Sequence, residues 1–256
     1  MTSPVKTSFP AAADPSEKPG GAGANAADRP IRDSLLGFVA VTAAVSLLYR
    51  LRGVPLIERN LAVIAAVLFL YLPAFVLWRR GRDLEHYGLR ATPLSRGLLA
   101  YALGVVLILP LFGLGYWLYV TRYCLPLAVG ARHWLGAALL GHCPPRLPAA
   151  VRLPPEFLMA ALSQLLVVAL PEEFFFRGFV QGRLQEALSP LRALLLTALL
   201  FALGHYLVTF DPAALAVFFP GLLFGLLRQA TGSVLAGTLF HATCNLFMET
   251  LRRSLG

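Results

Sequence analysis

The sequence predicts an all-α bundle of transmembrane helices behind a disordered amino-terminal tail. Of the 256 residues, 57% are hydrophobic and only 14% are charged, and the mean hydropathy is +0.69. An ordinary soluble domain carries roughly 25% charged residues. Apolar runs also recur along the chain, and most approach the roughly 20 residues that a helix needs to cross a bilayer. These observations predict an integral membrane protein whose surroundings are the lipid bilayer.

The formal net charge of +9 fits this class better than it fits a nucleic-acid-binding protein. A nucleic-acid-binding protein needs its basic residues clustered on one polar face. Here they occupy short segments between apolar runs, as the loops of membrane proteins do. We therefore exclude nucleic acid as a partner.

Three regions are expected along the chain. Residues 1–31 hold five prolines, the pair Gly20 and Gly21, and no apolar period, which predicts a disordered tail. Residues 32–154 would form amino-terminal transmembrane helices with a connecting loop, and residues 155–256 a carboxy-terminal transmembrane core. The first apolar run begins only at Leu35, so we expect a signal anchor and not a cleaved signal peptide.

Seven apolar runs are candidate spans, and six to eight spans are compatible with the sequence. The first and sixth runs are short, and the segment from Cys124 to Cys143 is apolar enough to lie at the interface or to re-enter the membrane. The seven runs are Leu35–Tyr49, Leu61–Trp78, Leu98–Val120, Phe157–Phe179, Ala193–Phe210, Ala213–Leu227 and Ser233–Leu251.

The distribution of Lys and Arg favours a cytoplasmic amino terminus. With seven spans, the amino-terminal side of the membrane collects 12 basic residues and the opposite side nine. Cys124 and Cys143 then share an outer connection where they could pair, whereas Cys244 lies in the last span. A metal loop with His133 and His142 is the alternative, but the gaps match no familiar ligand spacing, and we expect an ordinary loop.

Two of the 13 acidic residues lie deep in an apolar run. A charge at mid-bilayer costs about 2.5 to 3.5 kcal/mol, so such residues are rare and usually functional. Glu173 and Arg177 are four residues apart and share a helix face, which predicts an ion pair. Glu172 points about 100° away and has no such partner, so it is the candidate general base. Pro171 removes one backbone hydrogen bond and is expected to open room for water.

Two later runs each carry a deep histidine. His205 follows Phe201 by one turn, and His241 shares a helix face with Asn245. Each feature alone is also compatible with a structural role, as an ion pair or as a polar contact between helices. Their coincidence on three apolar runs indicates that the polar groups converge on one wet cavity.

The combination of EExxxR, FxxxH and HxxxN on successive runs resembles the CAAX protease and bacteriocin-processing (CPBP) family, which includes the Ras-converting CAAX endopeptidase. The resemblance covers roughly residues 155 to 250, and the segment from Gly225 to Ser233 is similar to the family's usual connection. It implies a glutamic-type intramembrane protease. Glu172 with His205 would activate a water, and His241 with Asn245 would donate to the tetrahedral oxyanion. The supporting residues would be Glu173, Arg177 and Phe201.

A zinc-dependent version of the same reaction remains the second interpretation. Glu172, His205 and His241 would supply three ligands and water the fourth. We rank it second, and expect no cofactor, because no HExxH pair is present and asparagine is a poor zinc ligand. A non-catalytic binding or immunity protein is another alternative. A proton-relaying transporter is a third, weakened by the lack of an obvious internal repeat.

The expected substrate is a membrane-anchored or lipidated protein cut near its terminus. The richness in alanine, leucine and arginine is typical of GC-rich coding, so we expect a bacterial plasma membrane as the location. The activity would then suit a sorting protease that removes a carboxy-terminal membrane anchor.

Overall fold

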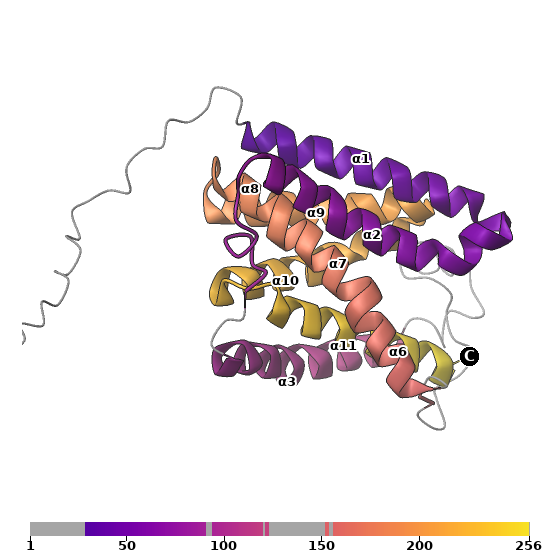
Figure 1. The fold of residues 1–256 in the computed structure, drawn as a ribbon. Helices are drawn as coiled ribbons and strands as arrows, with labels where there is room; N and C mark the ends of the chain where they lie inside the picture. The colour runs from indigo at the N-terminus through magenta and orange to yellow at the C-terminus, as the bar shows by residue number, and fades with distance from the viewer. Residues whose placement is uncertain (1–28, 91–93, 120, 123–151, 154–155, 256) are drawn as a thin grey trace, which may run out of the picture.

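The computed structural model describes residues 29–90, 94–119, 121–122, 152–153 and 156–255, and within these ranges it contains helices and no strand (Figure 1). The predicted all-α class is therefore confirmed. The α-helices are α1 (Pro30–Arg50), α2 (Pro55–Arg79), α3 (Leu94–Tyr119), α6 (Phe157–Ser163), α7 (Leu170–Glu173), α8 (Gln181–Gln185), α9 (Pro190–Thr209), α10 (Phe218–Thr231) and α11 (Leu235–Leu255). Short 3-10 helices are η1 (Leu51–Gly53) and η5 (Pro212–Val217), and π-helical segments are η3 (Gln164–Ala169) and η4 (Phe174–Val180).

Six stretches in the described ranges are helical, long and apolar enough to cross a membrane. They are Pro30–Gly53, Pro55–Arg79, Ser95–Leu118, Phe157–Gln185, Pro190–Thr209 and Pro212–Thr231. The seventh predicted run is the 21-residue helix α11, but His241, Asn245 and Glu249 make it more polar than the other six. The count of six lies within the predicted range of six to eight.

Some predictions concern residues outside the described ranges. They are the tail over residues 1–28 and the loop with Cys124, Cys143, His133 and His142. The remaining cysteine, Cys244, is a free thiol in α11. At the start of the described chain, Pro30 occupies the first turn of α1, where its missing amide hydrogen costs no helical hydrogen bond.

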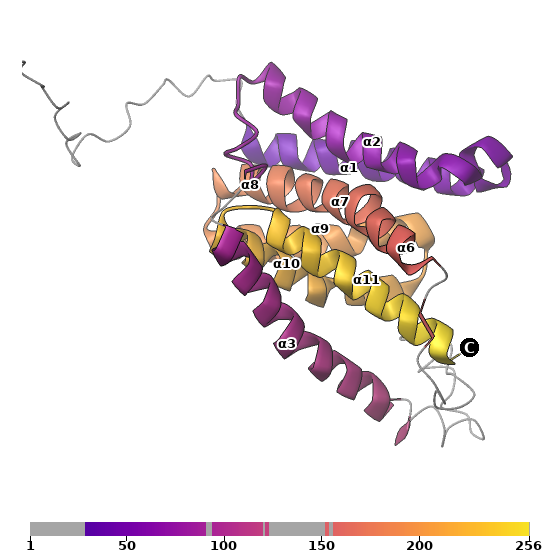
Figure 2. The ribbon, with the colours of Figure 1, turned by 60° about the horizontal axis from the view of Figure 1, so that its bottom comes forward.

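The helices stack so that the carboxy-terminal half of the chain lies in the middle of the bundle. Helices α1 and α2 lie side by side on one face, α3 lies on the opposite face, and α6 to α11 lie between them (Figures 1 and 2). Helix α9 packs against both α1 and α10, and α11 packs against α10 and α3. No single helix therefore holds the predicted site residues: Glu172 and Glu173 lie in α7, His205 in α9, and His241 and Asn245 in α11.

The stretch from Phe157 to Gln185 crosses the bundle as one continuous helix with two π-helical segments. These segments flank the four residues of α7, which include Pro171 and both deep glutamates. Single π-helical turns inside α-helices often occur at functional sites, because the extra residue redirects the side chains around it. The four phenylalanines of η4 are almost fully buried and form the centre of the core, which holds this irregular segment in place.

Candidate active site

Glu173 and Arg177 form an ion pair in the centre of the core, as the sequence predicts. Arg177 Nη1 donates to Glu173 Oε1 at 3.1 Å, and both side chains are 0% exposed. Arg177 Nη2 donates to the carbonyl oxygen of Gly221 on α10, also at 3.1 Å. A Cβ atom at Gly221 would lie 3.2 Å from the Phe201 ring, so this glycine allows α10 to approach closely.

Aromatic rings surround the buried guanidinium. The Cζ atom of Arg177 lies 4.2 Å from the ring centroid of Phe201, 5.1 Å from that of Phe224 and 5.8 Å from that of Phe176. The negative faces of aromatic rings attract a cation, and this attraction is strongest where water is excluded. Phe201, the nearest of these rings, therefore stabilises the charge of Arg177.

A second hydrogen bond links the ion pair to His241. His241 Nδ1 donates to Glu173 Oε1 at 2.9 Å, and the imidazole stacks on Phe224 with ring centroids 4.7 Å apart. Because the carboxylate oxygen accepts this bond, Nδ1 carries a proton. The other nitrogen, Nε2, lies 3.9 Å from Glu172 Oε2.

His205 is oriented in the same way by its own helix. Its Nδ1 donates to the carbonyl oxygen of Phe201 at 2.9 Å, which leaves Nε2 as the acceptor nitrogen of the neutral ring. That Nε2 atom lies 4.0 Å from Glu172 Oε2. The sequence pattern FxxxH is thus a single hydrogen-bonded turn that presents Nε2 to the glutamate.

Glu172 lies between the two histidines. Its Oε2 atom is buried and has no hydrogen-bond partner among the described residues, although the side chain as a whole is 17% exposed. A buried carboxylate oxygen normally has a hydrogen-bond donor, and its lack of one is typical of a group that is available to a ligand or to the reacting water. The side chain of His205 is 34% exposed and that of His241 only 6%, so the site is more open to its surroundings at His205.

Asn245 lies one turn after His241 and is held by a residue that the sequence analysis did not identify. Its Nδ2 donates to Oε1 of Gln164, the first residue of η3, at 3.0 Å. Gln164 is an uncharged polar residue inside the apolar run Phe157–Phe179, and this unusual position is the sequence feature that could have identified it. A filter for charged residues does not detect it.

A second glutamine was missed for the same reason. Gln181 is fully buried one turn after Arg177, and its Nε2 donates to the carbonyl oxygen of Gly225 at 3.2 Å. Gly225 in turn follows Gly221 by one turn of α10. Two hydrogen bonds, one turn apart, therefore join the helix of the glutamates to α10.

The fit of a metal ion to these residues can be tested by geometry. Throughout the described ranges, no group of three His, Cys, Asp or Glu side chains is arranged to hold a metal ion. The nearest set is Glu172, His205 and His241, with Oε2 to Nε2 distances of 4.0 and 3.9 Å. Tetrahedral zinc ligands at about 2.0–2.1 Å from the metal lie about 3.3 Å from one another. Zinc binding would therefore require these side chains to move closer together.

Comparison with protein families gives a match over the carboxy-terminal part of the chain. A family model described as Type II CAAX prenyl endopeptidase Rce1-like matches residues 154–247. The matched segment contains the two glutamates, both histidines, Asn245 and the newly identified Gln164. No curated protein and no solved structure matched the chain.

Proposed function

We propose, from the premise that residues 154–247 belong to the Rce1-like CAAX protease family, that this protein is an intramembrane endopeptidase using a glutamate-activated water. The family implies a membrane protease that acts on a protein substrate. One observation supports Glu172 as the base: its buried, unpartnered Oε2 atom lies 4.0 and 3.9 Å from the Nε2 atoms of two histidines. A carboxylate in this setting is suited to accept a proton from water.

The separation between Glu172 and His205 suits a shared water. An Oε2 to Nε2 distance of 4.0 Å is too long for a direct hydrogen bond. A water within about 2.8 Å of each atom spans this distance readily. Glu172 would take a proton from that water as its oxygen bonds to the peptide carbonyl carbon, and the carbonyl oxygen would become the oxyanion.

Asn245 and His241 are the proposed oxyanion donors. The Asn245 amide carries two N–H groups, and Gln164 accepts only one hydrogen bond from it. His241, whose Nδ1 is held by Glu173, would donate to the oxyanion through Nε2 when that nitrogen carries a proton. When the C–N bond breaks, the proton held by Glu172 passes to the leaving amine, which gives a carboxylic acid and an amine as products.

The setting of the site defines the proposed substrate and location. Glu172 and His205 lie in membrane-spanning helices, so the substrate is proposed to be a membrane-anchored or lipidated protein cut near its terminus. We keep the bacterial plasma membrane and a cytoplasmic amino terminus as proposals, together with the role of a sorting protease that removes a carboxy-terminal anchor. Comparing protein termini in cells with and without this protein would identify the substrate, and an unchanged set of termini would contradict the proposal.

Replacing Gln164 by Leu is expected to lower kcat about tenfold and to leave KM nearly unchanged. Leucine is similar in size but cannot accept the hydrogen bond that orients the Asn245 amide, and oxyanion donors act mainly in the transition state. Kinetics on the identified substrate would measure both constants. The matched control is Gln229→Leu, which removes a hydrogen bond to Pro190 far from the site and should leave kcat unchanged. An unchanged kcat in Gln164→Leu would show that Gln164 does not position Asn245.

Treatment of the purified protein with a zinc chelator is expected to leave cleavage intact. In the proposed mechanism the activated water is held by Glu172 and His205, and no step needs a Lewis acid. Cleavage before and after chelation, together with the zinc content of the protein by mass spectrometry, would test this. Loss of activity that is restored by added zinc would favour the second interpretation, with Glu172, His205 and His241 as ligands.

A further inference from the structure

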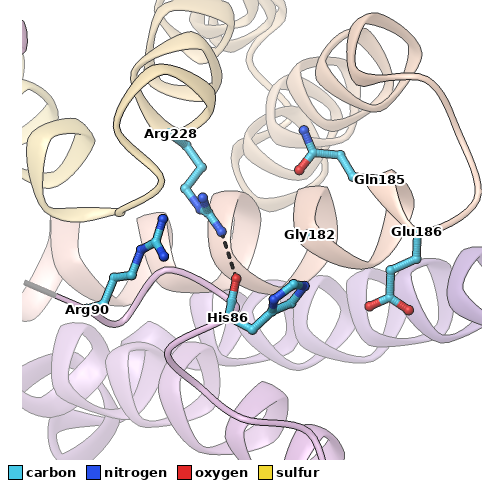
Figure 3. A pocket seen from close by; sticks show the side chains of 6 residues that line it. All are labelled: His86, Arg90, Gly182, Gln185, Glu186 and Arg228. Carbon is cyan, nitrogen blue, oxygen red and sulfur yellow. Dashed lines mark hydrogen bonds between the residues drawn. The ribbon is translucent and has the colours of Figure 1, made fainter. Parts of the chain in front are cut away.

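A polar cavity of ≈ 350 Å³ (Figure 3) is lined by residues other than Glu172, Glu173 and the two site histidines. It is lined by His86, Arg90, Gly182, Gln185, Glu186 and Arg228. These residues follow or end membrane spans: Gln185 closes one span, and Arg228 lies in the last turn of α10. The cavity therefore lies where the bundle meets a membrane surface.

Two arginines bring uncompensated positive charge to the cavity. Arg228 Nη2 donates to the carbonyl oxygen of His86 at 3.1 Å, and its Nε atom is buried without a hydrogen-bond partner. Arg90 Nε donates to the carbonyl oxygen of Gly232 at 3.0 Å. Among the described residues, neither guanidinium forms an ion pair with a carboxylate. Backbone carbonyls orient the two side chains but do not neutralise them.

The carboxylate in the cavity wall is already engaged by other groups. Glu186 Oε2 accepts from Arg183 at 2.6 Å and lies 3.5 Å from Arg82, and Oε1 accepts from the Tyr87 hydroxyl. Burial, together with this bond to Glu186, raises the pKa of Tyr87 to about 12, so the phenol keeps its proton and remains a donor. Figure 3 shows Glu186 across the cavity from Arg90 and Arg228. The arginines are thus free to attract an external anion.

The position of the cavity favours a lipid over the end of a cleaved peptide. Gln185 follows Glu172 by 13 residues of helix, which corresponds to about 20 Å. The end of a released peptide would reach the cavity only if about six of its residues were extended along this path. Basic cavities between transmembrane helices at the membrane surface are suited to phosphate-bearing headgroups, which arginine recognises through its fork of N–H donors.

We propose that this cavity binds the phosphate of an anionic membrane lipid through Arg90 and Arg228. The headgroup would accept hydrogen bonds from the unpartnered Nε of Arg228 and from the free N–H groups of Arg90. The bound phosphate would contact Arg90, in the loop after α2, and Arg228, near the end of α10. It would therefore hold these two segments together beside the end of α8. This proposal is independent of the chemistry at Glu172.

The test uses the full-length protein in nanodiscs of phosphatidylcholine, with or without phosphatidylglycerol, and measures lipid retention by native mass spectrometry and the Tm. Phosphatidylglycerol is expected to remain bound and to raise Tm. Each arginine near the surface contributes to anionic lipid binding by about fivefold in affinity. The double variant Arg90→Gln/Arg228→Gln should therefore lose about 25-fold, and Arg192→Gln, an exposed arginine outside the cavity, should bind as the wild type does.

Three results would overturn the proposal. The first is a double variant that retains phosphatidylglycerol as well as the wild type does. The second is equal loss in Arg192→Gln, which would indicate a general effect of surface charge. The third is equal stabilisation by inorganic phosphate alone, which would assign the cavity to a free anion. Arg90→Lys/Arg228→Lys, which keeps both charges, separates loss of binding from loss of folding, because it should retain part of the lipid binding.

Discussion

Glu172→Gln is expected to lower the rate of substrate processing by about 10²- to 10⁴-fold, the usual contribution of a general base. Glutamine has nearly the same shape but cannot accept the proton of the attacking water. The Oε2 atom of Glu172 has no hydrogen-bond partner in the described structure, so the replacement removes no structural contact of that atom. The measurement is the cleavage rate of the identified substrate, with the amount of inserted protein determined in the same membranes.

The matched control for this variant is Glu156→Gln. Glu156 is exposed at the amino-terminal cap of α6, makes no side-chain cap hydrogen bond and begins the same helical stretch. We expect it to retain full activity. If Glu172→Gln cleaves normally, the glutamate mechanism is wrong. If no terminus depends on this protein and Glu172→Gln still protects cells against a bacteriocin, the non-catalytic immunity function is favoured.

Arg177→Met is expected to cause the largest loss of stability, about 3 to 5 kcal/mol, because it leaves Glu173 as a buried charge without its ion-pair partner. The carbonyl oxygen of Gly221 also loses its donor, and the rings of Phe201 and Phe224 lose the cation between them. We expect a lower Tm in detergent and less inserted protein. Thermal unfolding of the purified protein measures the first of these, and quantitative blotting of membranes measures the second.

Two further variants show how much of the lost stability comes from the unpaired charge of Glu173 and how much from lost packing. Arg177→Met/Glu173→Gln removes both charges and should recover part of the lost Tm, because no uncompensated ion remains in the core. Arg253→Gln breaks the i,i+4 pair with Glu249, where both side chains are partly exposed, and should change Tm little. Equal losses in Arg177→Met and Arg253→Gln would contradict the assigned role of the buried pair.

The sequence predicted the helical class and the main polar residues for physical reasons that leave a clear signal. Charges inside apolar runs are costly, so Glu172, Glu173 and Arg177 were recognised as unusual. The i,i+4 spacing of Glu173 and Arg177 predicted the ion pair between these two residues. The seventh run was expected as a span, yet α11 is more polar than the six apolar helices because it carries His241, Asn245 and Glu249. Polar residues lower the mean hydropathy of the helix that carries them, and mean hydropathy is the property by which a span is recognised.

Other parts of the site depend on packing that no spacing rule describes. The π-helical segments lie on both sides of α7, and the phenylalanines of η4 are buried in the core. The contact of Gln164 with Asn245 joins residues 81 positions apart, and the bond of His241 to Glu173 joins residues 68 apart. Convergence of the three clusters and the pairing of His205 with Glu172 were predicted, but the hydrogen bond of His241 to Glu173 was not.

The two hydrogen bonds from Arg177 and Gln181 to the carbonyls of Gly221 and Gly225 also limit how the protein can open. Sliding either helix along the other by one residue, about 1.5 Å, would break both bonds at once. These helices are therefore expected to move as one rigid unit during a catalytic cycle. A substrate segment would then reach Glu172 by separation of other helices, and crosslinking this seam should leave turnover intact.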